Sequence, residues 1–370
     1  MIGSFGDRNP EGPIFDLGEM TPENWIKFRE ARETAAKQII QRVGAKFESH
    51  KVLVLVDLQG IYLSLHKWLS DQNFPIEGGL VLSRLAFFQL QNIFERIAAQ
   101  VLESSNGLCT DFEDLLTNIK QHGIGGTVIL KPEAIYVSVV PKFELFYAPA
   151  PLMDIKWKLK SQACSGSYDA KEQLKKIEAG ILVHSYFERD YAAYDDFVAK
   201  LKANPESSQS EKGFFSFRVG EKGLERFDEK EVDCRIVIRA MDAFHNYEAD
   251  SLCIVSSDQD FLPLHDRARE FGIRYYQADV AKFSTESYAA RKLRDLGSNF
   301  LLGEFDPTWP SRIIVEACAQ VNEGIPAMYT LRENELPALC KMHNSMNEVH
   351  ISAHYLSDGT ATLKWYKPAE

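Results

Sequence analysis

Ser251-Leu-Cys-Ile-Val-Ser-Ser-Asp-Gln-Asp-Phe-Leu-Pro-Leu264 is the stretch that decides the fold of this chain. Its first part, residues 252–255, is a short apolar run, which is typical of a strand buried on both faces. Small polar residues then end the strand and place Asp258 and Asp260 at its carboxyl end. Apolar residues at helical spacing follow, and a second strand is expected at 273–277. This order predicts an open parallel α/β sheet, in which ligands bind outside the carboxyl ends of the strands.

Length and composition predict an ordinary soluble globular chain. It has 370 residues, of which 45% are hydrophobic and 26% charged, so it can form one large domain with appendages or two domains. No apolar run approaches the ~18 residues that a membrane helix needs, and no secretion signal opens the chain. The cytoplasm is therefore the expected location. The six cysteines contain no CxxC pair and are interpreted as reduced, mostly structural thiols.

The formal net charge of -11 argues against broad, non-specific attraction to polyanions. A nucleic acid would therefore have to be held by a local basic surface. For any single basic cluster, a solvated face is the favoured interpretation. The candidate clusters are Lys156, Lys158 and Lys160 beside Trp157; Lys171, Lys175 and Lys176; and Arg291, Lys292 and Arg294.

The chain outside the opening stretch predicts a second buried strand and several helices. This strand is Val52-Leu-Val-Leu-Val56, an unbroken apolar run that ends in Asp57. The other elements expected before residue 251 are a helix from Thr21 to about Val43 after a loose tail, a helix at 80–102, one or two strands within 127–147, a helix from Ser185 to about Ala203, a polar, turn-rich segment at 204–213, a strand at 214–219 and a helix at 234–244.

The C-terminal part predicts a small separate module. Two helices, 311–323 and 332–343, precede a hairpin that turns at Ser357-Asp-Gly-Thr360, an order that suggests a winged-helix-like unit. Acidic residues outnumber basic ones in it, which favours protein contact or simple packing over nucleic-acid binding. The expected domains are an N-terminal tail and helix at 1–48, an α/β domain at 49–304 with a large insertion within 66–226, and the helix-helix-hairpin module at 305–370.

Four aspartates are candidates for one site. Asp57 and the pair Asp258 and Asp260 follow strands, and Asp233 is expected in the first turn of a helix, where the helix dipole favours a carboxylate. Converging carboxylates repel one another unless they hold a divalent cation, and oxygen ligands suit Mg²⁺ or Mn²⁺, which can activate water for attack on a phosphate. Taken singly, an aspartate after a strand is more often a turn former or a helix cap than a metal ligand.

Three motifs resemble those of the NYN domains, a branch of the PIN-like metal-dependent ribonucleases. They are Val54-Leu-Val-Asp57, Lys230-Glu-Val-Asp233 and Val255-Ser-Ser-Asp-Gln-Asp-Phe-Leu-Pro-Leu264. The resemblance implies a three-layer α/β sandwich with a mainly parallel sheet that cleaves RNA internally with Mg²⁺ or Mn²⁺. It implies that Asp57, Asp233, Asp258 and Asp260 are catalytic metal ligands or their supports, that Ser256 and Ser257 order the turn, and that Lys230 and Arg239 contact the RNA.

This chain departs from the family pattern at three positions. Gly60 stands where an asparagine is usual, Arg239 where a second helix acid is usual, and Ser298 where a final aspartate is frequent. An arginine inside the site would compete with the cation.

Three hypotheses follow from the resemblance and these departures. The first is a metal-dependent endoribonuclease that acts on RNA. The second is a catalytically degenerate NYN domain that binds RNA or a protein partner without cleavage, the C-terminal module being one surface for such a partner. The third is a different metal-dependent phosphoesterase that acts on nucleotides or structured DNA.

Overall fold

The computed structural model describes most of the chain from residue 46 onward. The described ranges are 46–76, 79–105, 108–109, 135–149, 151–178, 181–184, 187–203, 207–220, 223–280, 288–295, 299–302, 307–322, 334–357 and 360–368, with Leu331 and isolated residues between 27 and 41. The described residues of the expected N-terminal helix, such as Lys27 and Ile40, are helical, and the others of that helix lie outside this set. Residues 127–134, in the expected strand region, and Ser298 also lie outside it.

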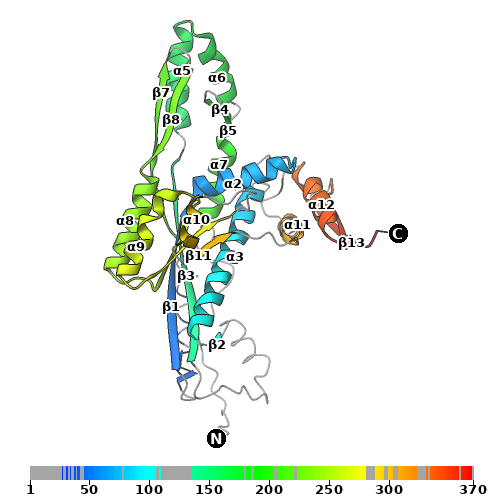
Figure 1. Cartoon of the computed structure of the whole chain (residues 1–370). Coiled ribbons are helices and arrows are strands. Elements are labelled where there is room, and N and C mark those ends of the chain that lie inside the picture. Colours follow the sequence, from blue (N-terminus) through cyan, green and yellow to red (C-terminus); the bar gives the residue numbers. More distant parts are fainter. Residues whose placement is uncertain are drawn as a thin grey trace.

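A parallel sheet forms the centre of the described chain (Figure 1). Its strands follow the order β11, β10, β9, β1, β3, with β2 paired to the start of β3 and β6 to its end. Every one of these pairings is parallel. The strands are β1 (Lys46–Asp57), β2 (Leu108–Cys109), β3 (Ile135–Tyr147), β6 (Ser207–Lys212), β9 (Ser251–Val255), β10 (Arg274–Asp279) and β11 (Asn299–Leu302).

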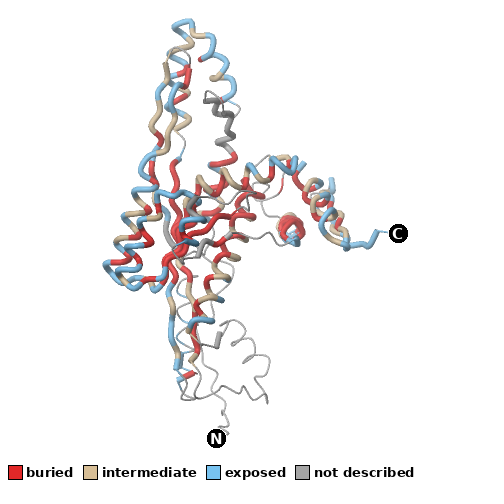
Figure 2. Tube along the Cα trace, in the orientation of Figure 1, coloured by how far each residue is buried: buried red, intermediate tan, exposed pale blue. Residues whose placement is uncertain are grey.

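The two central strands are the apolar runs singled out in the sequence. All five residues of β9 are buried, as are residues 52–56 of β1, because helices cover both faces of the sheet (Figure 2). Helices α8 and α9 lie on one face, and α2 and α3 lie on the other (Figure 1). The helices of this domain are α2 (Leu58–Asp71), α3 (Leu80–Ser105), α7 (Tyr191–Lys202), α8 (Val232–His245), α9 (Pro263–Glu270) and α10 (Tyr288–Asp295). The predicted PIN-like α/β sandwich is confirmed.

A long arm projects from the sheet domain (Figure 1). Helices α5 and α6 pack on each other and on an antiparallel hairpin of β7 and β8. Phe215 and Phe227 stack inside the hairpin with ring centroids 4.3 Å apart, and Gln173 of α6 accepts a hydrogen bond from the backbone of Leu224 at 2.7 Å. The arm contains α5 (Leu152–Cys164), α6 (Tyr168–Glu178), β7 (Phe214–Gly220), β8 (Gly223–Lys230) and the hairpin of β4 (Ile181–His184) and β5 (Phe187–Asp190), of which β4 contacts α6 and β8.

The structure corrects two predictions for residues 185–213. The helix expected from Ser185 begins only at Tyr191, because β4 (Ile181–His184) and β5 (Phe187–Asp190) form a hairpin before it. The segment expected to be turn-rich, 204–213, contributes β6, a polar edge strand that pairs with β3. The arm lies mostly within residues 66–226, where a large insertion is expected, and the same range also contains α3 and β3 of the sheet domain.

The C-terminal module has the predicted order of helix, helix and hairpin. It consists of α11 (Trp309–Asn322), α12 (Glu335–Met346), β12 (His350–Tyr355) and β13 (Ala361–Tyr366), and the two strands pair antiparallel. Trp309 is buried and its ring contacts that of Trp68 on α2, so the module packs against the sheet domain. In the part of the chain that the structure describes, no helix is long and apolar enough to cross a membrane.

Candidate active site

Asp57 ends the central strand β1 and begins helix α2. Its Oδ1 accepts a hydrogen bond from the Gly60 backbone N–H at 3.0 Å, so it caps the helix, as the simpler interpretation expected. The hydroxyl of Ser256 donates to its Oδ2 at 3.3 Å. Because Val56 and Val255 are register partners in neighbouring parallel strands, the ends of β1 and β9 lie side by side. The contact with Ser256 therefore ties the two motifs together at one edge of the sheet.

The turn after β9 presents two exposed carboxylates. The Ser256 hydroxyl oxygen accepts a hydrogen bond from the Asp258 backbone N–H at 3.2 Å, and Asp258 Oδ1 accepts one from the Asp260 backbone N–H at 2.9 Å. Asp258 thus caps the short 3₁₀ turn Gln259–Phe261 that precedes α9. Ser257 and both aspartates are exposed. Capping engages one oxygen of Asp258, and a carboxylate has further lone pairs that can bind a cation.

Gln277 on β10 braces this turn, a role that the sequence did not reveal. The side chain is fully buried, and its Nε2 donates to the carbonyl oxygens of Ser256 at 2.8 Å and Asp258 at 2.6 Å. Its Oε1 accepts a hydrogen bond from the Tyr275 hydroxyl at 3.2 Å. The backbone that carries Asp258 is therefore held from the neighbouring strand. A glutamine at a fully buried strand position was the only signal in the sequence.

Replacing Gln277 by leucine should loosen the turn. Gln277→Leu leaves the carbonyl oxygens of Ser256 and Asp258 without this donor, and the expected loss in the free energy of unfolding is about 1–3 kcal/mol in urea titrations. Tyr275→Phe is the control, because it removes the hydroxyl that contacts Gln277 and the Phe261 carbonyl oxygen but keeps both hydrogen bonds from Gln277 to the turn. Equal losses in the two variants would contradict the bracing role.

Asp233 lies at the start of α8, directly after the arm returns to the sheet domain. It is exposed in the first turn of α8, as predicted. The residue before this helix, Glu231, has φ 72°, a left-handed conformation that is uncommon outside glycine. This backbone turn leads from the end of β8 straight into α8, so Asp233 lies next to the base of the arm. Lys230, expected to contact RNA, is exposed at the end of β8.

The charges of the four aspartates are coupled to one another. Burial raises the pKa of Asp57 to about 6, and the charge of Asp233 adds to this, although hydrogen bonds from Gly60 and Ser256 oppose it. Burial also raises the pKa of Asp233, and so do the charges of Asp258 and Asp260. The structure thus brings the four predicted aspartates into one region of negative potential.

The side chains of this region are of the type that binds a divalent cation, but in their present positions they are not close enough together to do so. Carboxylate oxygens are the ligands that Mg²⁺ and Mn²⁺ prefer, and their mutual repulsion is what a cation would relieve. Among the described residues, however, no three His, Cys, Asp or Glu side chains are grouped closely enough to hold a metal ion. Binding would therefore need rotation of the exposed side chains of Asp233, Asp258 or Asp260.

Gly60 leaves room for the Asp57 carboxylate to cap helix α2. A Cβ atom at this position would lie 2.5 Å from Asp57 Oδ2, which is closer than real contacts allow. The asparagine usual in the family could fit here only if the Asp57 carboxylate turned away from its present hydrogen bonds. The observed orientation of the Asp57 carboxylate therefore requires a glycine at position 60.

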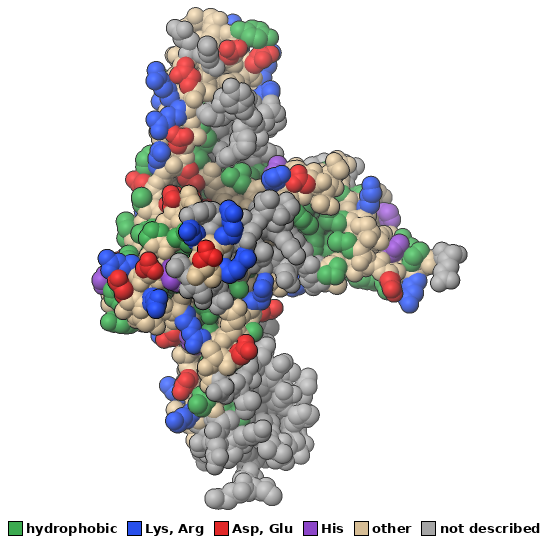
Figure 3. Space-filling model, viewed as in Figure 1, with side chains coloured by type: hydrophobic (Ala, Val, Ile, Leu, Met, Phe, Trp, Pro, Cys, Tyr) green, Lys and Arg blue, Asp and Glu red, His purple; other side chains and the backbone are tan. Residues whose placement is uncertain are grey.

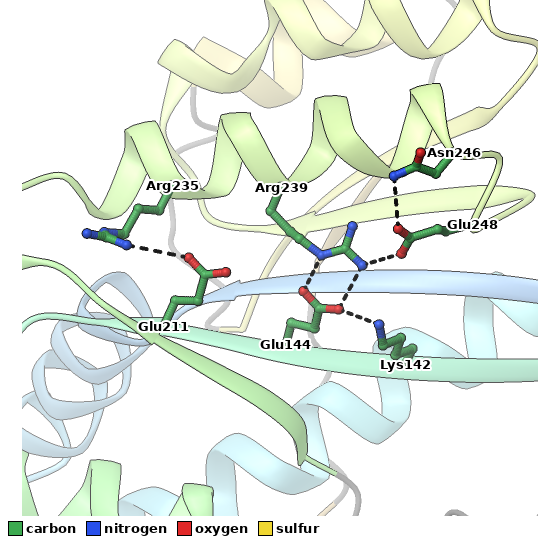
Figure 4. Close-up of polar contacts among 7 residues, drawn as sticks. All are labelled: Lys142, Glu144, Glu211, Arg235, Arg239, Asn246 and Glu248. Atoms are coloured by element: carbon green, nitrogen blue, oxygen red, sulfur yellow. Dashed lines mark hydrogen bonds and ion pairs between the residues drawn. The ribbon is translucent and has the colours of Figure 1, made fainter.

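Arg239 is engaged in an ion-pair cluster beneath α8 (Figure 4). Its guanidinium donates two hydrogen bonds to Glu144 of β3, at 2.7 and 2.9 Å, and one to Glu248 at 2.5 Å. Lys142 also pairs with Glu144 at 2.8 Å. Asp233 lies six residues earlier, which is about 9 Å along the helix and on a different face. Arg239 thus anchors α8 to the sheet, which corrects the expectations that it contacts substrate or competes with a bound cation.

Asp279 is a further acid at this edge, and no motif in the sequence indicated it. Ala278 of β10 is the register partner of Val255, so Asp279, Ser256 and Asp57 occupy the same level at the ends of three adjacent strands. Asp279 is buried, whereas the predicted strand stopped at Gln277. Ser298, the family position without its aspartate, lies outside the described residues.

A family model described as the NYN domain matches residues 160–301. This chain carries an NYN domain. NYN domains are PIN-like and belong to a nuclease family, in agreement with the sheet and with the three motifs. Among curated proteins and solved structures, none matches the chain. The matched segment contains Asp233, Asp258 and Asp260, whereas β1 with Asp57 precedes it and pairs with β9 of the matched segment.

Proposed function

We propose that this NYN domain is a metal-dependent endoribonuclease whose site is formed by Asp57, Asp233, Asp258 and Asp260. The observation that carries the proposal is the electrostatic coupling of these aspartates at the carboxyl edge of a parallel sheet. Ligands of open α/β sheets bind at this edge. The NYN match adds the nuclease class.

The residues of the chain have distinct tasks in this proposal. Asp57 is fixed by Gly60 and Ser256, so it provides a carboxylate of constant position. Asp233 and Asp258 are exposed and would hold Mg²⁺ or Mn²⁺ with it, while Asp260 orients a ligand or a water molecule. A cation bound there would activate water and stabilise the charge that develops on the phosphate. Exposed Lys230, at the base of the arm, would contact the RNA backbone.

A domain that binds without cleavage is the second candidate. Two observations favour it: no three acidic side chains of the described chain form a ready metal group, and the second helix acid of the family is replaced by the structural Arg239. In this case the aspartates would be remnants of the site, and the chain would bind RNA or a protein partner.

Cleavage of a mixed set of labelled RNAs by the purified full chain tests the proposal. We expect fragments with Mg²⁺ or Mn²⁺, none with EDTA, and none from Asp258→Asn with either ion. Asp266→Asn is the matched control, since Asp266 is also exposed on α9 and lies outside the four aspartates. Cutting by Asp258→Asn at the rate of the unaltered chain would refute the assigned site, and no cutting with either ion would favour the binding domain. Matched DNA in the same assay separates a ribonuclease from a broader phosphoesterase.

A further inference from the structure

The arm leaves the sheet domain after β3 and returns to it at the start of α8 (Figure 1). It begins just after β3, in which Phe146 is the register partner of Asp57. It ends at Lys230, three residues before Asp233. A polymer that approaches the candidate site would therefore pass the base of the arm. Lys and Arg side chains are frequent along one edge of the arm, with acidic ones among them (Figure 3).

Helix α5 of the arm presents two large apolar side chains to solvent. Met153 is 78% exposed and Trp157 is 73% exposed. They are four residues apart, so they share one helix face. The opposite face is fully buried through Ile155 and Leu159, which fixes the orientation of the helix. A tryptophan held on a rigid helix with its ring in water is a feature of binding surfaces rather than of a core.

The same helix is basic in an acidic chain. Three lysines and one aspartate lie on α5, whereas the whole chain has 42 basic and 53 acidic residues. Lys156 pairs with Glu178 at 3.6 Å, and the Lys158 ammonium lies 4.4 Å from the centroid of the Phe217 ring. Lys160 is exposed three residues after Trp157, and no described side chain pairs with it.

We propose that the face of α5 formed by Met153, Trp157 and Lys160 binds single-stranded RNA on its way to the aspartates, an inference that rests on the proposed function. An exposed aromatic ring can stack on an unpaired base while a nearby lysine contacts the backbone phosphate. A helix face that docks on protein repeats apolar residues over several turns. Here the stripe continues after Trp157 with Lys160, Ser161 and Cys164, so the chemistry fits RNA better.

Binding without cleavage tests this surface. The probe is a fluorescein-labelled, unstructured 20-nucleotide RNA, and anisotropy is measured in EDTA with full-length chain carrying Asp258→Asn. Adding Trp157→Ala should weaken binding by roughly 5- to 150-fold, the range for the loss of one stacked base, and Trp157→Tyr should restore most of it. Lys160→Ala should lower the slope of log affinity against log salt by about 1. Lys51→Ala, at an exposed lysine in the amino-terminal half of β1, should change neither.

Two results would overturn the proposal. One is equal RNA affinity of the chain with and without Trp157→Ala, with both folded by circular dichroism. The other is loss of self-association by the Trp157→Ala chain in sedimentation with no change in RNA affinity, which would assign the face to a second copy. The binding test needs no catalysis. If RNA binding depends on Trp157 while the unaltered chain cuts no RNA with Mg²⁺ or Mn²⁺ in the cleavage assay, the nuclease is refuted and the RNA surface stands.

Discussion

Asp57→Asn is expected to make the metal-free chain more stable at neutral pH and to bring RNA cleavage down to the EDTA background. The folded state holds this carboxyl with a pKa of about 6, above the ordinary value of 3.8, because the group is buried near Asp233. At pH 7 it must nevertheless be ionised. An asparagine keeps the helix cap to Gly60 and carries no charge, so the repulsion disappears together with the metal ligand.

The sign of the pH dependence follows from the raised pKa. Between pH 4 and 6 the folded state binds more protons at Asp57 than the unfolded state, so the unaltered chain loses stability relative to the variant as the pH rises. The full difference is present above pH 6 and absent below pH 4. Its upper bound is about 3 kcal/mol, and solvent that reaches the partly buried carboxylate reduces it.

Urea titrations of both chains in EDTA at several pH values between 4 and 7.5 measure this difference. Asp71→Asn is the matched control, because Asp71 is exposed on the same helix and its removal should change stability by less than ~0.5 kcal/mol. A variant that is less stable than the unaltered chain at pH 7.5 would show that Asp57 is a structural cap and not a strained site residue.

Arg239→Met is expected to destabilise the fold strongly, by about 3–5 kcal/mol. Glu144 is 2% exposed, and without the guanidinium its buried charge keeps only Lys142 as a partner. The second variant, Arg239→Met with Glu144→Gln, removes the buried charge as well and should regain part of the loss. Urea titrations at pH 7.5 give both numbers. A double variant no better than Arg239→Met would contradict the charge argument.

Arg235→Met is the matched control for this experiment. Arg235 lies one turn earlier on α8 and pairs with Glu211 (Figure 4). It also pairs with Glu231, and both glutamate side chains are accessible to solvent. Its loss should change stability by less than about 1 kcal/mol, since exposed ion pairs contribute little. If Arg235→Met lowered the free energy of unfolding as much as Arg239→Met, the loss would come from substitution on α8 in general and not from the buried charge of Glu144.

The central strands and the aspartates could be predicted because their signals are local. The apolar run of β9 and the polar turn after it lie within ten residues, and the same holds for β1 and Asp57. The order of the C-terminal module was also readable, since its turn and its strand alternation are adjacent in the sequence.

The features that the sequence did not reveal depend on distant partners. Strand β6, Ser-Ser-Gln-Ser-Glu-Lys, has no strand pattern of its own and forms because β3 offers it a free edge. Arg239 could be interpreted as a site residue until Glu144, 95 positions away, was seen to hold it. Gln277 is explained only by carbonyl groups of the turn about 20 residues earlier.

The central position of β1 has a consequence for synthesis on the ribosome. Its partner β9 follows it by 199 residues at the level of Asp57 and Ser256. At ordinary translation rates this separation corresponds to about 10–40 s. During that interval β1 can pair with β3 alone, and its other edge is uncovered along the apolar run 52–56. The nascent chain therefore has to protect this edge from other chains, and the two halves of the aspartate site meet only late in synthesis.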